Sequence, residues 1–170
     1  MSDNIDIEPK IPSYNQPQLD RYVELINEKI SEKAIVESYI NEPNFHLSTL
    51  IVDKKEWLRL AEFIKADEAF RFNFLMNLSG VDYVEYMEVI YHLYSYERDQ
   101  YLAIKVQTER DGGSVPSVIN VWRTADWQER EAYDLLGIGF TGREITRILM
   151  PDDWVGHPLR KDYVMPEEEV

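Results

Sequence analysis

Two alternating segments separated by a short polar stretch set the strictest limit on the fold. Residues 86–96 form a long run rich in Tyr, with Val89 among its apolar residues, and in residues 101–108 aliphatic side chains fall on one face and polar ones on the other. The four residues between them, 97–100, are Glu-Arg-Asp-Gln and are typical of a turn. Because side chains alternate between the two faces of a strand, this pattern predicts an antiparallel hairpin with one apolar face that other elements must cover.

Two segments carry apolar residues at helical spacing and could cover that face. The first runs from Leu19 to Ile30 with charges between the apolar positions. The second is predicted over residues 54–67, where Asp53 and Glu56 match a D-x-x-E variant of the capping box that starts a helix. Both segments are therefore expected to be amphipathic helices with one buried stripe.

Three further runs are predicted to be strands. Residues 33–40 indicate an edge strand, residues 45–52 a strand with two partly apolar faces, and residues 72–79 a strand that ends near Gly80. The predicted order is helix, two strands, helix, three strands. This order indicates an α+β fold, namely a two-layer domain with helices on one face of a mixed, mostly antiparallel sheet, followed by an extended irregular C-terminal segment.

The composition divides the chain into three parts. Residues 1–17 contain three prolines and no helical or strand period, which predicts a flexible N-terminal arm. Residues 18–110 make up the α+β domain. Residues 111–170 are expected to be a helix, running to about Leu136, and an extended segment of the same domain that docks on a partner.

The stretch 137–166 is turn-rich yet apolar, which is an unusual combination. It carries Trp154, Leu159 and Tyr163 among other large side chains. A long irregular segment inside a compact domain is uncommon unless it binds something, and a segment this apolar must pack on its own sheet or on another chain.

The overall composition excludes several classes of function. The chain has no cysteine, which excludes disulfides, thiol catalysis and iron–sulfur ligation by this chain. Its net charge of −14 disfavours binding to nucleic acid and to anionic lipid. No run is long and apolar enough to span a bilayer, and the first residues do not resemble a secretory signal.

Two motifs suggest chemistry but have simpler interpretations. Residues 137–142 match G-x-G-x-x-G, but they follow a predicted helix instead of a strand, so a helix C-cap and turn is favoured over a dinucleotide site. Asp152, Asp153 and His157 could form a metal or acid–base cluster. No second motif supports that cluster, and an Asp after Pro151 is more simply a turn residue.

The predicted helix at 127–136 carries a carboxylate that needs a partner. At helical spacing Glu131 lies between Trp127 and Leu135 on one apolar stripe. A carboxylate in such a place must find a donor or shift its pKa. We therefore expect at least one Arg–carboxylate pair that pins the irregular segment to this helix, with the arginine supplied by one of Arg123, Arg130, Arg143, Arg147 and Arg160.

Two further stretches stand out, residues 129–138, EREAYDLLGI, and residues 147–163, RILMPDDWVGHPLRKDY. They resemble the signature and the C-terminal motif of the 30 kDa subunit family of respiratory complex I. This family includes the C subunit of bacterial NADH-quinone oxidoreductase and the J subunit of the photosynthetic NDH-1 complex. The chain departs from the family pattern where Leu136 replaces an aromatic residue and where Arg143 and Glu144 replace a His-Pro pair. These departures affect the helix end and the turn after it.

The resemblance implies a non-catalytic structural subunit of the hydrophilic arm. It implies that this chain binds no cofactor, while FMN and iron–sulfur clusters in partner subunits carry electrons from NADH to quinone in a proton-pumping complex. It also implies the large quinone-site subunit (49 kDa type) and neighbouring iron–sulfur subunits as partners, and a peripheral place on the cytoplasmic side of the cell membrane.

The residues expected to dock on those partners lie in the two motifs, and Trp154, Leu159, Arg160 and Tyr163 are the expected anchors because large aromatics and Arg dominate interface energetics. The full set of candidates is Glu129, Arg130, Glu131, Asp134, Arg147, Asp152, Asp153, Trp154, His157, Leu159, Arg160, Lys161, Asp162 and Tyr163.

Two alternatives remain open from the sequence. The same subunit type could serve a ferredoxin-driven or hydrogenase-linked membrane complex, which the motifs do not distinguish. A more remote possibility is a free-standing enzyme that uses Asp152, Asp153 and His157.

Overall fold

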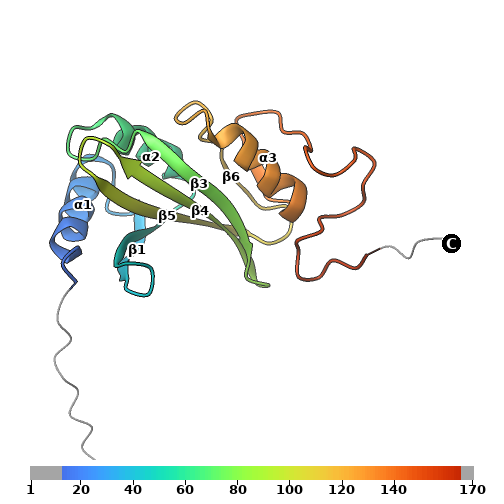
Figure 1. The fold of residues 1–170 in the computed structure, drawn as a ribbon, viewed down its shortest axis with the longest axis horizontal. Helices are drawn as coiled ribbons and strands as arrows, with labels where there is room; N and C mark the ends of the chain where they lie inside the picture. Colours follow the sequence, from blue (N-terminus) through green and yellow to red (C-terminus); the bar gives the residue numbers. More distant parts are fainter. Residues whose placement is uncertain (1–12, 166–170) are drawn as a thin grey trace, which may run out of the picture.

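A five-stranded sheet forms the centre of the protein (Figure 1). The computed structural model describes residues 13–165. Only the central pair β2–β5 is parallel, and the three other pairings are antiparallel, so the sheet is mixed and mostly antiparallel as predicted. In spatial order the strands are β1 (Ile35–Asn41), β2 (Leu47–Val52), β5 (Gln100–Glu109), β4 (Tyr86–Ser95) and β3 (Phe74–Asp82).

The β4–β5 hairpin is the one that the alternating segments predict. Its register pairs Tyr91 with Ile104 and Leu93 with Leu102, and these side chains are buried. The alternate positions of β4 face the opposite side of the sheet, where Ile90, His92 and Tyr94 are partly exposed and Glu88 is buried. One face of the sheet is therefore the core face, and we call the opposite side the open face.

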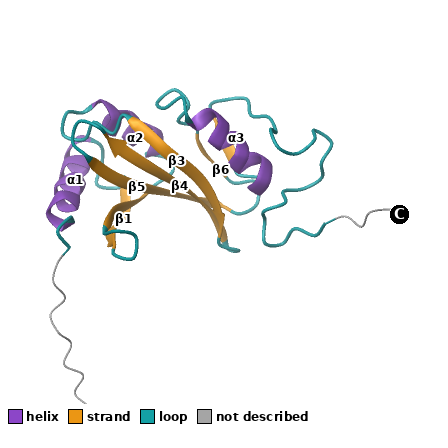
Figure 2. Cartoon of the chain, in the orientation of Figure 1, coloured by secondary structure: helices purple, strands orange, loops and turns teal. Residues whose placement is uncertain are grey.

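Three helices complete the core: α1 (Gln16–Lys29), α2 (Trp57–Ala66) and α3 (Ala125–Leu136). Figure 2 shows the helices and strands in separate colours. The buried positions of α1 and α2 recur at helical spacing, and they join the core face of the sheet in one apolar cluster. The rings of Trp57, Tyr91 and Trp122 pack together in this cluster, with centroid distances of 4.5 and 6.3 Å from Trp57.

A second, two-stranded sheet is not predicted by the sequence. It consists of β6 (Ser114–Pro116) and β7 (Gly139–Thr141), which run parallel. The backbone N–H of Ser117 also donates to the carbonyl of Thr141 at 3.0 Å. Three-residue strands carry too little periodicity to be recognised in sequence, and here they bring the two ends of the α3 region together.

The predicted capping box is wrong. α2 begins at Trp57, and its N-cap residue Glu56 makes no side-chain cap hydrogen bond. Asp53 instead accepts the N–H of Lys55 at 2.7 Å. This is an Asx-type turn that follows the preceding strand. A short Asp side chain can accept a nearby backbone N–H in such a turn as readily as at a helix start, so the sequence pattern alone does not distinguish the two.

Two predicted boundaries also move. Gln16 and Pro17 belong to α1, with the proline in the first turn, and residues 1–12 of the predicted arm lie outside the described residues. The helix expected soon after Pro116 begins only at Ala125, because residues 117–124 form turns. A proline fixes its own φ but does not specify how soon a helix follows.

Residues 142–165 contain no helix or strand, as predicted for the irregular C-terminal segment. In Figure 1 this segment (orange to red) loops around the outer side of α3. Among the described residues no helix is long and apolar enough to cross a membrane.

Candidate docking segment

We call residues 142–165 the docking segment, since they include most of the residues singled out above. A chain of this length without secondary structure leaves its backbone groups in need of other partners. Two buried carboxylates, Asp134 on α3 and Asp82 at the end of β3, accept backbone N–H groups of the segment. A third, Glu129 on α3, binds the segment through the side chain of Arg143. Buried carboxylates are tolerated only when donors surround them, and each of the three binds a different part of the chain.

Glu129 ties α3 to the segments that flank it in sequence. Its carboxylate accepts the hydroxyl of Ser117 at 2.7 Å, the N–H of Val118 at 2.8 Å and the Arg143 guanidinium at 3.2 Å. Burial raises the pKa of Glu129, and the three donors oppose that rise. Arg143 also pairs with Asp126, so the start of the docking segment is held against the first turn of α3.

Asp134 holds the middle of the segment. One carboxylate oxygen accepts three consecutive backbone N–H groups, from Ile148 at 3.0 Å, Leu149 at 2.7 Å and Met150 at 3.0 Å. The other oxygen accepts Arg147 at 2.7 Å. Burial by itself raises the pKa of Asp134, but these donors outweigh it and lower the pKa to about 2.

Asp82 holds the end of the segment. Arg110 donates to both of its carboxylate oxygens, at 3.1 and 2.9 Å, in a bidentate pair. The backbone N–H of Lys161 donates to the same carboxylate at 2.9 Å, and that of Val84 at 2.7 Å. The hydrogen bonds from Arg110 are the largest cause of a strongly lowered pKa of Asp82.

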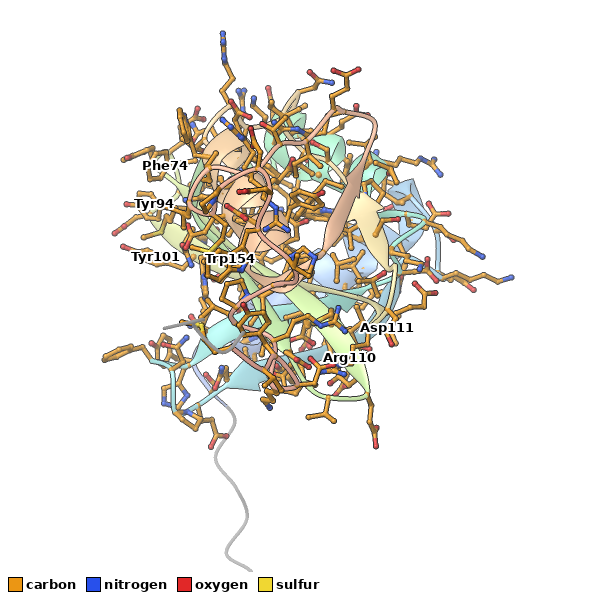
Figure 3. The ribbon with its side chains drawn as sticks, turned by 90° about the vertical axis from the view of Figure 1, so that its right-hand side faces the viewer. Phe74, Tyr94, Tyr101, Arg110, Asp111 and Trp154 are labelled. Carbon is orange, nitrogen blue, oxygen red and sulfur yellow. The ribbon has the colours of Figure 1, made fainter. Side chains whose placement is uncertain are left out.

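The same arginine extends this network toward the C-terminus. Arg110 also pairs with Asp162 at 2.9 Å, and Arg160 pairs with Asp162 at 3.3 Å and with Asp111. Figure 3 shows Arg110 and Asp111 on the same side of the molecule. The guanidinium of Arg160, a predicted partner anchor, is therefore engaged within the chain.

The C-terminal end of α3 provides a fourth contact. Gly137 adopts a left-handed conformation (φ 76°) as the helix C-cap, which confirms the C-cap interpretation of the glycine motif. The His157 ring lies against it, so close that an added Cβ would come within 2.6 Å of the ring. His157 also bonds through Nδ1 to the carbonyl of Asp134 at 2.9 Å, and the N–H of Leu159 donates to the carbonyl of Leu135 at 2.9 Å.

The expected Arg–carboxylate pairing is confirmed, but it uses different carboxylates. Glu131 is exposed, and so is Trp127 on the same stripe. The buried side of α3 carries Glu129 and Asp134. Trp127 makes this stripe look apolar in the sequence although the side chain is exposed. Which side of α3 is buried is decided by its packing against β3, which the sequence does not reveal.

Arg130 contributes from the exposed side of α3. Its guanidinium donates to the carbonyl of Thr146 at 3.2 Å, the hydroxyl of Thr146 at 3.0 Å and the carbonyl of Arg147 at 3.1 Å. It lies over the Trp127 ring at 5.0 Å from the centroid. Arg130 thus binds the docking segment from α3, and Arg147 binds α3 from within the segment; both are among the arginines named from the sequence.

The residues of the hypothetical catalytic cluster do not form a site. Asp152 and Asp153 are exposed, whereas the His157 ring is packed against α3. Within residues 13–165 no group of three His, Asp or Glu side chains is arranged to hold a metal ion. The backbone N–H of Trp154 donates to the carbonyl of Pro151 at 3.0 Å, so the two aspartates lie in a turn, as their simpler interpretation predicts.

The outer surface of the docking segment carries large apolar side chains among exposed charged ones such as Asp152 and Asp153. Leu149, Val155 and Leu159 are exposed, and so are Val164 and Met165 near its end. Trp154 and Tyr163 are half-buried, and in the described structure the Trp154 indole N–H and the Tyr163 hydroxyl have no hydrogen-bond partner. The segment therefore binds the buried carboxylates with part of its backbone and exposes large apolar side chains.

A family profile covers most of the chain, including this segment. Residues 50–169 match the family described as respiratory-chain NADH dehydrogenase, 30 Kd subunit. The chain belongs to this family. The match runs from β2 through the docking segment, so all three anchoring carboxylates lie inside it.

Curated members of the 30 kDa family are similar over about two thirds of this chain. The C subunit of NADH-quinone oxidoreductase from Roseiflexus sp. (strain RS-1) is 47% identical over 115 residues, which cover 65% of this chain and 66% of that protein. The corresponding protein of Chlorobium phaeobacteroides is 45% identical over 121 residues, covering 69% and 73%. The C subunit of Chloroherpeton thalassium is 45% identical over 114 residues, which cover about half (48%) of that protein.

Two solved structures share the fold. A chain from the membrane-bound sulfane sulfur reductase, an archaeal respiratory membrane complex, superposes with a TM-score of 0.69 at 22% identity and covers 87% of this chain and 86% of that one. A trypsin-resistant fragment of Nqo5 gives a TM-score of 0.58 at 24% identity and covers 73% and 98%. These likenesses support the α+β architecture.

Proposed function

We propose that this chain is a structural subunit of the hydrophilic arm of a proton-pumping NADH–quinone oxidoreductase. Its relatives are named as the C subunit of NADH-quinone oxidoreductase. The observation that carries the proposal is the docking segment, which three buried carboxylates hold through backbone N–H groups and through Arg143, while large apolar side chains are exposed. Such a surface has the composition of an interface core flanked by charge.

We further propose that the chain binds no cofactor and supplies no catalytic residue of its own. FMN and iron–sulfur clusters would then lie in other subunits, and electrons from NADH would reach quinone without passing through this chain. The lack of cysteine supports this role, because cluster ligation by thiolate is not available.

The proposed partners are the large quinone-site subunit of the 49 kDa type and the iron–sulfur subunits beside it. The docking segment would cover part of the quinone-site subunit, with Trp154, Leu159 and Tyr163 as apolar contacts. Attachment to the membrane, proposed on its cytoplasmic side, would be indirect and would run through those partners.

The test is recovery of the tagged full chain from native membranes in mild detergent, with mass spectrometry of its partners and an assay of NADH:quinone activity. The proposal expects a quinone-site protein, iron–sulfur proteins and activity in one fraction. A chain that stays alone, or that comes with no quinone-site protein, would contradict it.

The second candidate is the same subunit type in a ferredoxin-driven or hydrogenase-linked membrane complex. The fold shared with a chain of the sulfane sulfur reductase favours keeping this alternative, since it shows the same architecture in a different respiratory complex. Hydrogenase-type or ferredoxin-linked partners in the recovered fraction, without NADH activity, would select it.

A further inference from the structure

A second surface lies on the open face of the sheet, away from the docking segment. A cavity of about 720 Å³ opens where the start of α1 and the β1–β2 turn meet strands β3, β4 and β5. Its apolar walls include Tyr14, Phe45, Met76 and Tyr101. We call it the Tyr101 pocket, and none of residues 142–165 lines it.

The pocket continues into a row of aromatic side chains on the same face. The ring centroids are 5.5 Å apart for Phe74 and Tyr96, 4.9 Å for Tyr96 and Tyr94, and 4.6 Å for Tyr94 and Tyr101. In Figure 3, Phe74, Tyr94 and Tyr101 project from one side of the molecule. Phe45 on the pocket rim is 88% exposed and Tyr101 is 52% exposed. Contiguous exposed aromatic side chains usually mark a site of interaction with another molecule.

The pocket carries negative charge and no cation. Among its described lining residues Asp99 is the one carboxylate, and there is no lysine or arginine. The neighbouring Arg98 is turned away, because its guanidinium donates to the carbonyl of Glu68. His92 in the lining has its pKa lowered by burial and by Lys105, so it is neutral at pH 7. The remainder of the polar lining is mainly amide groups, which add no charge.

Asp99 is held in a fixed position. The hydroxyl of Tyr94 donates to Asp99 Oδ1 at 2.7 Å. That hydrogen bond raises the pKa of Tyr94 to about 12, so the phenol stays protonated and keeps donating at neutral pH. The carboxylate is therefore oriented beside the aromatic wall.

We propose that the Tyr101 pocket receives a basic side chain, arginine above all, presented by another protein chain. A planar guanidinium can stack its face on a tyrosine ring while the N–H groups at its edge pair with a carboxylate. A compact ammonium group combines these two contacts less well. The net charge of −14 favours approach of a basic segment over an acidic one. This surface is independent of the docking segment and does not rest on the identity of the complex.

The first test uses the isolated full chain and small probes. In an NMR titration N-acetyl-L-arginine amide is expected to shift the amide signals of residues 99–102 and His92 in a saturable way. The neutral isostere N-acetyl-L-citrulline amide is expected to bind roughly tenfold more weakly. Equal binding of the two probes, or no saturable binding of the arginine probe, would overturn the proposal.

A matched pair of variants separates a specific site from general acidity. Asp99→Asn should weaken arginine binding roughly tenfold, whereas Glu97→Gln, which removes the same charge two residues away and outside the lining, should leave it unchanged. Asp99 has a left-handed backbone (φ 49°), which asparagine tolerates, so the substitution preserves the turn. An equal loss in both variants would mean unspecific attraction and would overturn the site.

The second test identifies what fills the pocket in the assembled complex. A photoreactive p-benzoylphenylalanine at Phe45, crosslinked in native membranes, should yield a peptide of another chain with an arginine or lysine close to the crosslinked residue. A crosslink to a lipid, to an acidic or wholly apolar segment, or to no other chain would overturn the proposal. Because the titration needs no assembly, its failure is distinguishable from failure of the proposed subunit role.

Discussion

The sheet domain and the docking segment are ordered by different interactions. In the sheet domain, apolar side chains from α1, α2 and the core face pack in one cluster, and the strands satisfy one another's backbone groups. In the docking segment Asp134 accepts three consecutive backbone N–H groups and Asp82 accepts that of Lys161, while turns and a contact with the end of α3 satisfy others. Order without secondary structure here depends on a few charged groups instead of on many apolar contacts.

This difference bears on function. A helix or strand of the domain packs its apolar side chains into the core, so fewer of them are exposed for contact with a partner chain. The docking segment is held from its backbone side, and its large apolar side chains are left outside. Four predictions, in decreasing order of their effect on stability, test whether the two regions are held independently.

The greatest loss of stability is expected in the sheet domain. Trp57 is fully buried between Tyr91 and Trp122. Trp57→Ala should reduce the free energy of unfolding by about 3–5 kcal/mol, because a large cavity replaces the indole. Chemical denaturation followed by circular dichroism measures this, and Trp127→Ala, at an exposed position, is the control. A loss below about 1 kcal/mol would contradict the central place given to this cluster.

Asp134→Asn should instead loosen the docking segment while the sheet stays folded. The variant keeps the shape but loses the charge that holds Arg147 and three backbone N–H groups, at a cost of about 3 kcal/mol. Hydrogen exchange should speed up at the amides of residues 148–150 and stay slow in β4 and β5. Asp152→Asn, at an exposed residue, is the control. Faster exchange throughout the sheet would show that the two regions are not independent.

The contribution of Asp134 should depend on pH. Its pKa in the folded protein is lowered to about 2 from 3.8, so the stabilisation is complete above about pH 4 and is lost as the pH falls through 2. The shift corresponds to about 2 kcal/mol. The difference in unfolding free energy between the wild type and Asp134→Asn, measured from pH 6 to pH 2.5, should shrink over this window. A difference that does not change with pH would indicate that the carboxylate charge is not what holds the segment.

Trp154 should matter least for stability. Trp154→Ala should change the unfolding free energy of the isolated chain by less than about 1 kcal/mol, because the ring is half-buried and its N–H has no partner. The same variant should lower recovery of the assembled complex, since aromatic anchors dominate interfaces. Normal recovery with normal activity would remove Trp154 from the docking surface.

The regular elements are well predicted from the sequence, because each has a clear period. The alternation in residues 86–108 predicts the hairpin, and the apolar spacing in the first two helices predicts α1 and α2. Prediction fails where the signal is local and ambiguous. Asp53 matches a helix cap in sequence, but it forms a turn with Lys55, and both uses satisfy a nearby N–H equally well.

The docking segment is predicted in outline but not in detail. Its apolar, turn-rich composition indicates a segment that must pack on another surface. The several arginines in and near it indicate Arg–carboxylate pairs. The carboxylate chosen from helical spacing, Glu131, is exposed, whereas Glu129 and Asp134 are buried. The roles of Asp82 and Arg110 are missed altogether, because their link to Lys161 spans about half the chain and leaves no local pattern.

Periodicity, composition and motif are properties of neighbouring residues, and they were enough to establish the α+β class, the family and the irregular character of the C-terminal segment. The buried side of α3, the carboxylates that hold the docking segment and the position of the Tyr101 pocket became visible only in three dimensions. Each of these depends on groups far apart in the chain that meet only after the sheet has brought them together.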